Sequence, residues 1–251
     1  MLLIDNDIVS QLLTMDDCIR VQEEAFRQLP NGGAIHRPRI DMYVPAERED
    51  GYFRWGTMEG ANDGYFAIRM KSDIITWPRD ESGNWTEEKY CREPGTYCGL
   101  IFLFSTRNAE PLAFINDGVL QHFRVGGGAG IGVKYLSRED SRAVGMLGSG
   151  GMARAFLEAF KCVRDIKLCK VFSPTAGNRE AFAREMSQRL GIEVRAMPPE
   201  PSMPTTWASA RARYLAPMPA PPPTRMCCST PSLMKASGSA LRVETSRMSP
   251  Q

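Results

Sequence analysis

The stretch that most constrains the fold is VGMLGSGGMAR, residues 144–154, where a short apolar run leads into clustered glycines and then a helix-forming segment. From residue 143 the chain alternates between two kinds of segment. The expected strands are AVGML, KLCKVFS and IEVRA, and the expected helices between them are GMARAFLEAFKCV and NREAFAREMSQRL. Strands that alternate with crossover helices form a parallel sheet. The sequence therefore predicts an α/β fold with a Rossmann-type parallel sheet domain.

The glycine turn matches the pattern G-x-G-x-x-(G/A), with Gly148, Gly150 and Ala153 at its three small positions. In dinucleotide-binding loops the first glycine permits a tight turn, the second lets the backbone approach a pyrophosphate, and the third small residue lets helix and strand pack closely. The following helix offers free N–H groups to phosphates. A purely structural glycine turn is the alternative. The expected cofactor contacts in the turn are Gly148, Ser149, Gly150, Gly151, Met152 and Ala153.

The end of the second strand bears on which dinucleotide binds. A site for NAD usually has Asp or Glu there to bind the ribose 2′-hydroxyl, but this strand ends VFSPTAGNR and has no acid. Ser173, Thr175 and Arg179 are better suited to a 2′-phosphate, so the sequence favours NADP(H) within the NAD(P) class. The alternative is that Ser173 and Thr175 only shape a turn and cap the next helix.

The residues before this unit predict an α+β domain. Residues 7–29 carry apolar residues at helical spacing, and Thr14 is positioned to cap a helix over 16–29. Residues 39–77 alternate in short runs typical of antiparallel strands. The remaining expected elements are a turn-rich loop at 78–95, a hairpin formed by 96–105 and 111–117, and a helix at 119–136.

The last of these helices contains a second glycine-rich run, RVGGGAGIGVK, at 124–134. It does not fit a phosphate-binding loop, because Lys134 follows Val133 rather than a glycine and no Ser or Thr comes next. We expect instead that its small residues let the helix pack closely against a neighbour.

Composition excludes several classes of protein. The formal net charge of +2 does not indicate binding to nucleic acid or to a membrane surface. No window holds the 18 uninterrupted apolar residues of a membrane span, and MLLIDNDIVSQLL has acids in its apolar run, unlike a signal peptide. The 7 scattered cysteines indicate a reducing cytoplasm. With His36 and His122 as its 2 histidines, the chain predicts no metal site.

The segment LQHFRVGGGAGIGVKYLSREDSRAVGMLGSGGMAR, residues 120–154, resembles the ornithine cyclodeaminase/μ-crystallin family. In that family an Arg on a small-residue helix precedes a KYLxRxD-like segment, a short apolar strand and the glycine turn. The resemblance covers roughly residues 5–197. It implies a substrate and dimerisation domain joined to a Rossmann domain, a nicotinamide cofactor and a homodimer. We place the substrate domain at 1–124, the first Rossmann half at 125–197 and a non-family tail at 198–251.

The resemblance also implies roles for four residues outside the glycine turn. Arg39 in RPRIDM and Arg124 in HFRVGG match the family's carboxylate-binding arginines. Lys71 in AIRMKSDI matches its active-site lysine, and Thr96 in PGTYCG matches a threonine near the cofactor. An Arg binds a carboxylate with two parallel hydrogen bonds, so these cations suit an amino-acid or imino-acid substrate. Taken singly, each cation is better explained as a solvated surface charge, but the three together, in their matched contexts, favour a binding site.

The implied chemistry is hydride transfer at an α-carbon. An amino acid gives its α-hydride to the nicotinamide and becomes an imine. Water then releases ammonia, as in a dehydrogenase, or a side-chain amine expels it and the cyclic imine takes the hydride back, as in a cyclodeaminase. The alternatives left open are ornithine cyclodeamination, amino-acid dehydrogenation or ketimine reduction, and an inactive relic or NADP(H)-binding protein. The last is open because the family's proton-transfer Asp, in the later Rossmann domain, has no counterpart here.

The tail departs from the family pattern. Residues 198–251 hold 11 of the 18 prolines, and PMPAPPPTRMCCSTP is unsuited to a parallel sheet. A sheet that stopped at Ala196 would leave an open apolar edge. A disordered tail and a proline-rich interaction tail are two interpretations. Our hypothesis is a one-base frameshift near codon 197, because degenerate back-translation in a shifted frame permits the residues expected of further Rossmann strands. Stop codons in that DNA frame would contradict it.

Overall fold

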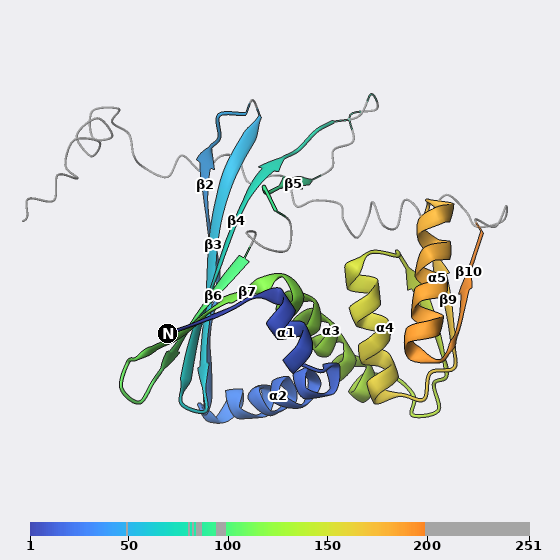
Figure 1. The fold of residues 1–251 in the computed structure, drawn as a ribbon, viewed down its shortest axis with the longest axis horizontal. Helices are drawn as coiled ribbons and strands as arrows, with labels where there is room; N and C mark the ends of the chain where they lie inside the picture. The colour runs from blue at the N-terminus through green and yellow to red at the C-terminus, as the bar shows by residue number, and fades with distance from the viewer. Residues whose placement is uncertain (49, 80, 82, 84–86, 94–98, 199–251) are drawn as a thin grey trace, which may run out of the picture. The chain divides into compact units, whose positions relative to one another are not determined.

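The structure is a computed structural model that describes residues 1–48, 50–79, 81, 83, 87–93 and 99–198 (Figure 1). Thr96 and nearly all of the expected tail lie outside the described residues. Within them, no helix is both long and apolar enough to cross a membrane.

A large sheet forms the first part of the chain. Its strands run in the order β1-β7-β6-β4-β3-β2, with β5 paired to β4. All neighbours are antiparallel except β1 and β7, which confirms the antiparallel strands and the hairpin expected from the sequence. The strands are β1 (Leu2–Ile4), β2 (Ala34–Pro45), β3 (Gly51–Asn62), β4 (Tyr65–Thr76), β5 (Glu88–Tyr90), β6 (Gly99–Ser105) and β7 (Pro111–Asn116). Strand β5 lies within the segment expected to be a loop, because three residues are too few to show a period.

The helices of this part lie on one side of the large sheet (Figure 1). They are α1 (Asn6–Leu12), α2 (Met15–Gln28), the short 3₁₀ helix η1 (Leu29–Asn31) and α3 (Asp117–Leu136). The expected cap is present, since Thr14 Oγ1 accepts a hydrogen bond of 3.1 Å from the N–H of Asp17. The domain boundary drawn at 124/125 falls inside α3, and the division into domains stays a prediction.

The second part of the described chain is the expected first half of a Rossmann domain. Three parallel strands stand in the order β10-β9-β8. The elements are β8 (Ala143–Leu147), α4 (Gly151–Val163), β9 (Leu168–Phe172), α5 (Ala176–Leu190) and β10 (Glu193–Ala196). Each matches an element predicted from the strand–helix alternation, so the α/β fold class is confirmed.

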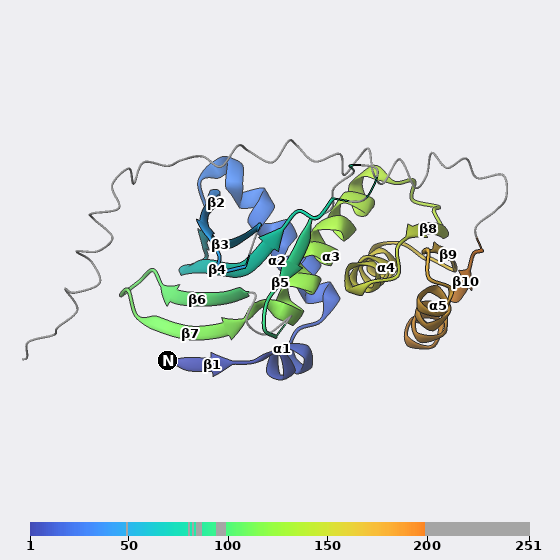
Figure 2. The same ribbon diagram turned by 90° about the horizontal axis from the view of Figure 1, so that it is seen from above.

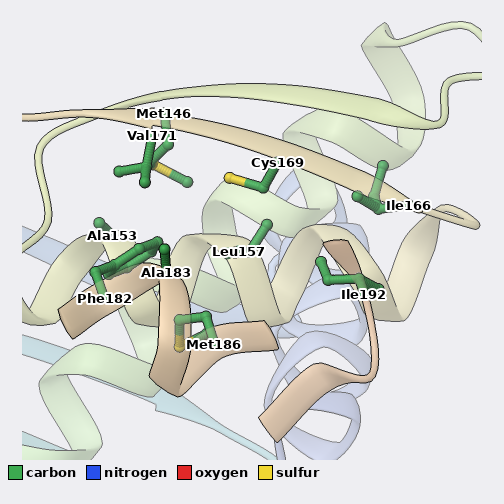
Figure 3. Packing of buried hydrophobic residues seen from close by; sticks show 10 residues of the cluster. All are labelled: Met146, Ala153, Leu157, Ile166, Cys169, Val171, Phe182, Ala183, Met186 and Ile192. Atoms are coloured by element: carbon green, nitrogen blue, oxygen red, sulfur yellow. The ribbon is translucent and has the colours of Figure 1, made fainter. Parts of the chain in front are cut away.

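The core of this half lies between the parallel strands and the helices α4 and α5 (Figure 3). Leu157 from α4, Val171 from β9, and Phe182 and Met186 from α5 are 0% exposed. Within the described residues β8 pairs only with β9, and Leu147 at its end is 65% exposed. Among the described strands, β8 is therefore at the edge of the parallel sheet.

Helix α3 joins the two parts, because it lies between the large sheet and α4 in both views (Figure 2). Gly126 and Gly130 of α3 pack against the backbone and side chains of Ala155 and Ala159 of α4. The glycine-rich run at 124–134 is thus a close-packed helix face, as predicted, and not a phosphate loop. This packing fixes α4, and with it the glycine turn, against the first part of the chain.

Candidate functional site

The glycine turn between β8 and α4 has an open backbone. Gly148 has a φ of +107°, in the region that favours glycine, and its N–H donates a 2.7 Å hydrogen bond to the carbonyl oxygen of Phe172. A Cβ placed on Gly148 or on Gly150 would meet nothing within 4 Å. Packing therefore does not explain why Gly150 is a glycine, whereas room for a ligand beside the backbone does.

The N-terminus of α4 leaves its first N–H groups without side-chain partners. The cap residue is Gly150, which has no side chain to accept a bond from these N–H groups, and the first turn contains no acid. Ala153 is only 6% exposed and belongs to the core cluster, which is the close helix–strand packing expected of the third small position. Met152 is half-buried beside it. These features together suit the binding of an anion at this end of the helix.

The residues proposed to choose the cofactor lie at the end of β9. Ser149 Oγ of the glycine turn donates a 2.9 Å hydrogen bond to Ser173 Oγ, so the turn and the strand end are adjacent. Thr175 is the cap residue of α5, but its side chain makes no capping bond. Arg179 Nη1 donates to the carbonyl oxygens of Ser173 at 3.0 Å and Pro174 at 3.3 Å. The structure therefore brings Ser173 and Arg179 together beside the glycine turn, and their role toward a cofactor stays a prediction.

A row of paired residues crosses the large sheet at Lys71. Asp41 on β2 pairs with Gly56 on β3, Gly56 pairs with Lys71 on β4, and Lys71 pairs with Gly99 on β6. Directly paired residues point to the same face of a sheet. The carboxylate of Asp41 lies against Gly56, and that of Asp117 lies against Gly99. The two glycines therefore make room for a carboxylate on each side of Lys71, on the face toward α3.

Lys71 is held by a buried ion pair on the same face. Its Nζ lies 3.1 Å from Asp73 Oδ2, and Asp73 accepts bonds of 2.8 and 2.6 Å from Nε and Nη2 of Arg54. Burial and the charge of Arg54 lower the pKa of Lys71 from its usual value. Burial alone would raise the pKa of Asp73, but the bonds from Arg54 and Lys71 outweigh burial and lower it.

Arg124, on α3, has a charge that no described side chain pairs. The nearby Arg69 binds Asp117 and also donates to Gln121 Oε1 at 3.1 Å. Arg124 is exposed and makes no hydrogen bond or ion pair among the described residues. Desolvation by its surroundings and repulsion from Arg69 lower its pKa. Such a guanidinium gains most from an anion that arrives from outside.

The three cations predicted from the sequence, Arg39, Lys71 and Arg124, are close enough for their charges to act on shared neighbours. The charge of Arg39 acts on Lys71, and the charges of Arg124 and Lys71 both act on Asp117, whose pKa burial raises. Arg39 itself donates from Nε to Asp41 Oδ1 at 2.6 Å.

Sequence reasoning missed several charged groups around these cations, namely Asp41, Arg54, Arg69, Asp73 and Asp117. The alternation of charges at 69, 71 and 73 on one strand was the available signal.

The family model described as "Ornithine cyclodeaminase/mu-crystallin family" matches residues 1–202. The chain belongs to this family. The resemblance inferred from the sequence is thereby confirmed.

Among curated relatives, the alanine dehydrogenase of Archaeoglobus fulgidus is 28% identical over 201 residues, which are 79% of this chain and 56% of that protein. A Δ1-pyrroline-2-carboxylate reductase of Bacillus cereus is 30% identical over 96 residues, 38% of this chain and 30% of that one. The chain spans about half the length of the first two curated relatives it matches, 51% and 56%.

Among solved structures, the Thermococcus litoralis Δ1-pyrroline-2-carboxylate reductase in complex with NADH and L-proline gives a TM-score of 0.62 at 27% identity. The match covers 78% of this chain and 57% of the reductase. An archaeal alanine dehydrogenase dimer with bound NAD gives 0.62 at 24% identity, covering 79% and 56%, and supports the fold alone.

Proposed function

We propose that the chain is an NAD(P)-dependent amino-acid-transforming enzyme of the ornithine cyclodeaminase type, which moves a hydride to or from the α-carbon of an amino or imino acid. The observation that carries the proposal is the placement of three cations, Arg39, Lys71 and Arg124, on the helix side of the sheet. Arg39 is bonded to the carboxylate that lies against Gly56 on one side of Lys71. Arg124 lies on α3, whose first residue places its carboxylate against Gly99 on the other side. Arg124 has no described partner. In this proposal the two arginines bind the substrate carboxylate, and Lys71 contacts the substrate beside it.

The glycine turn is proposed to bind the dinucleotide. The open space at Gly148 and Gly150 and the free N–H groups of α4 suit a pyrophosphate. When bound, the cofactor supplies the hydride acceptor or donor, and the protein supplies orientation and charge. The Thermococcus litoralis relative binds NADH, but the strand end here has no acid. We therefore propose that Ser173, Thr175 and Arg179 favour NADP(H), with Thr96 near the cofactor.

The direction of the reaction divides the proposal into alternatives. Curated relatives include an alanine dehydrogenase and pyrroline-2-carboxylate reductases, so dehydrogenation and imine reduction stand beside cyclodeamination. The second candidate function is binding without turnover. It is favoured by the lack of a recognisable counterpart in this sequence for the family's proton-transfer Asp.

The carboxylate site is tested by Arg124→Met, which removes the charge and keeps much of the side-chain volume. We expect the KM for Δ1-pyrroline-2-carboxylate, followed through oxidation of NADPH or NADH, to rise about 10- to 100-fold, the loss typical of a hydrogen bond to a charged group. Arg20→Met, on the exposed part of α2, is the matched control and should leave KM unchanged.

An unchanged KM in Arg124→Met would contradict the assignment of that arginine. If wild-type protein turns over none of the candidate amino and imino acids, calorimetry with L-proline and NADPH separates the remaining alternatives. Binding of both without turnover would favour the binding protein.

The proposed homodimer would use the face of the large sheet opposite Lys71. The β2 side chains on this face are largely uncovered, with Ile35 67%, Ile40 55% and Met42 55% exposed. Phe102 stacks on Phe114 with ring centroids 4.5 Å apart farther along the same face. Apolar faces of this extent mark interaction surfaces, and the archaeal alanine dehydrogenase is described as a dimer. A second copy of this chain is therefore the proposed partner.

The double substitution Ile40→Asp with Met42→Asp is expected to convert the dimer into a monomer, because it would bury two unpaired carboxylates in the interface. Light scattering after size-exclusion chromatography measures the mass. Val21→Asp, at a position on α2 that is 48% exposed, is the control and should leave a dimer. A double variant with the same mass as wild type would rule out this face.

We also propose a frameshift origin for the tail at 198–251 and a cytoplasmic location for the protein. The family match ends at residue 202, close to the change in composition at 198 that suggested a frameshift near codon 197. The scattered cysteines support a cytoplasmic location. The proposed division places the substrate domain at 1–124 and the Rossmann half at 125–197.

A further inference from the structure

Helices α3 and α4 contact each other at intervals of four residues. A Cβ on Gly126 would lie 2.8 Å from the carbonyl oxygen of Ala155, and the contact of Gly130 follows one turn later on both helices. One turn earlier, the corresponding residues are His122 and Gly151. A Cβ on Gly151 would lie 2.8 Å from Nε2 of His122. The series of contacts therefore continues to Gly151, the first residue of α4. At this last contact the residue on α3 is His122, whereas at the other two it is a glycine.

This packing places His122 at the glycine turn. Ridges at four-residue spacing on both helices interlock, and the close approach of backbone at Gly126 prevents α3 from sliding along α4. The His122 side chain is nevertheless exposed and makes no hydrogen bond among the described residues. A role in filling the core does not explain it. Its Nε2 stands against Gly151, whose N–H is one of the free donors of the first turn of α4.

Arg154, a cationic side chain near this turn, already has partners. Arg154 forms an ion pair of 2.6 Å with Glu185 and donates a 2.7 Å hydrogen bond to the carbonyl oxygen of Ser149. It thereby ties the turn to α5 and has its charge compensated. His122 is the neighbouring donor that remains free among the described residues.

We propose that His122 binds the pyrophosphate of the dinucleotide, donating a hydrogen bond from its ring to a phosphate oxygen held at the glycine turn. The inference rests on the cofactor site proposed above and adds to it a residue from outside the Rossmann half. Arg124 lies two residues farther along α3. The same helix would then contact the cofactor through His122 and the substrate carboxylate through Arg124.

The test measures the binding of ADP-ribose, which carries the pyrophosphate but no nicotinamide. We expect His122→Ala to raise the Kd about tenfold, as for loss of a charge-assisted hydrogen bond, and His122→Gln, which keeps a donor, to raise it less. His36→Ala removes the second histidine, exposed on β2, and should leave the Kd unchanged. Imidazole NMR signals provide a readout independent of affinity, and ADP-ribose should shift those of His122 alone.

Each outcome separates the two proposals. If wild-type protein binds ADP-ribose but His122→Ala binds equally well and the His122 signals do not move, the role of His122 is overturned and the cofactor site stands. If wild-type protein binds neither ADP-ribose nor its 2′-phosphate derivative, the cofactor site itself is wrong, and the inference about His122 fails with it.

Discussion

Replacing Asp73 by Asn is expected to lower the free energy of unfolding by about 3–5 kcal/mol, the usual cost of leaving one member of a buried ion pair without its partner. Asp73 and Arg54 are each only 5% exposed, and the carboxylate also holds Lys71 at 3.1 Å. The substitution keeps the shape of the side chain and removes its charge. Two cations would then face each other across an amide, and Arg54 has no other described anion at bonding distance.

Asp41→Asn is the matched control, because it makes the same change on the same face of the sheet. The side chains of Arg39 and Asp41 are 33% and 23% exposed, so water screens the pair and the loss should stay below about 1 kcal/mol. Urea unfolding measures both. Combining Asp73→Leu with Arg54→Met should recover much of the lost stability, since neither charge then remains buried. Equal losses at Asp41 and Asp73 would show that burial of the pair is not what matters.

The elements that the sequence predicts well are those with local signals. The strands at 39–77 and the Rossmann half carry their own hydrophobic period, and Thr14 is a cap that can be recognised within four residues. Strands β1 and β5 have three residues each, too few to show the alternation of apolar and polar residues that marks a strand. They form strands because they pair with a neighbouring strand, and the sequence of the segment alone does not show that pairing.

The candidate site divides in the same way. The glycine turn is contiguous in sequence, so its motif could be recognised directly. The pairing of Arg54 with Asp73 depends on the register of β3 against β4, and that of Asp117 with Arg69 depends on where α3 starts. His122 reaches Gly151 only because two helices pack at a particular offset. Sequence reasoning predicted that the small residues of α3 pack closely, but it could not give the partner residues of contacts set by strand register or by the offset of two helices. The charges at 69, 71 and 73 already marked one polar face.

The packing of α3 on α4 predicts that replacing a glycine of α3 by alanine destabilises the protein at one position and stabilises it at another. Gly126→Ala places a Cβ 2.8 Å from the backbone oxygen of Ala155, and backbone cannot move aside as a flexible side chain can. We expect a loss of about 1–3 kcal/mol, as for overpacked cores. Gly132→Ala meets nothing within 4 Å and should gain about 0.5–1 kcal/mol, because alanine loses less backbone entropy in a helix.

Thermal and urea unfolding of the two variants measure the difference, and each serves as the control for the other. The substitution, the helix and the helix propensity are the same, so only the neighbour at the Cβ differs. If both variants are stabilised, α3 and α4 are farther apart in solution than the contact at Gly126 requires. The contact of His122 with Gly151 depends on that same helix spacing, so this comparison also tests the geometry on which the proposed phosphate contact rests.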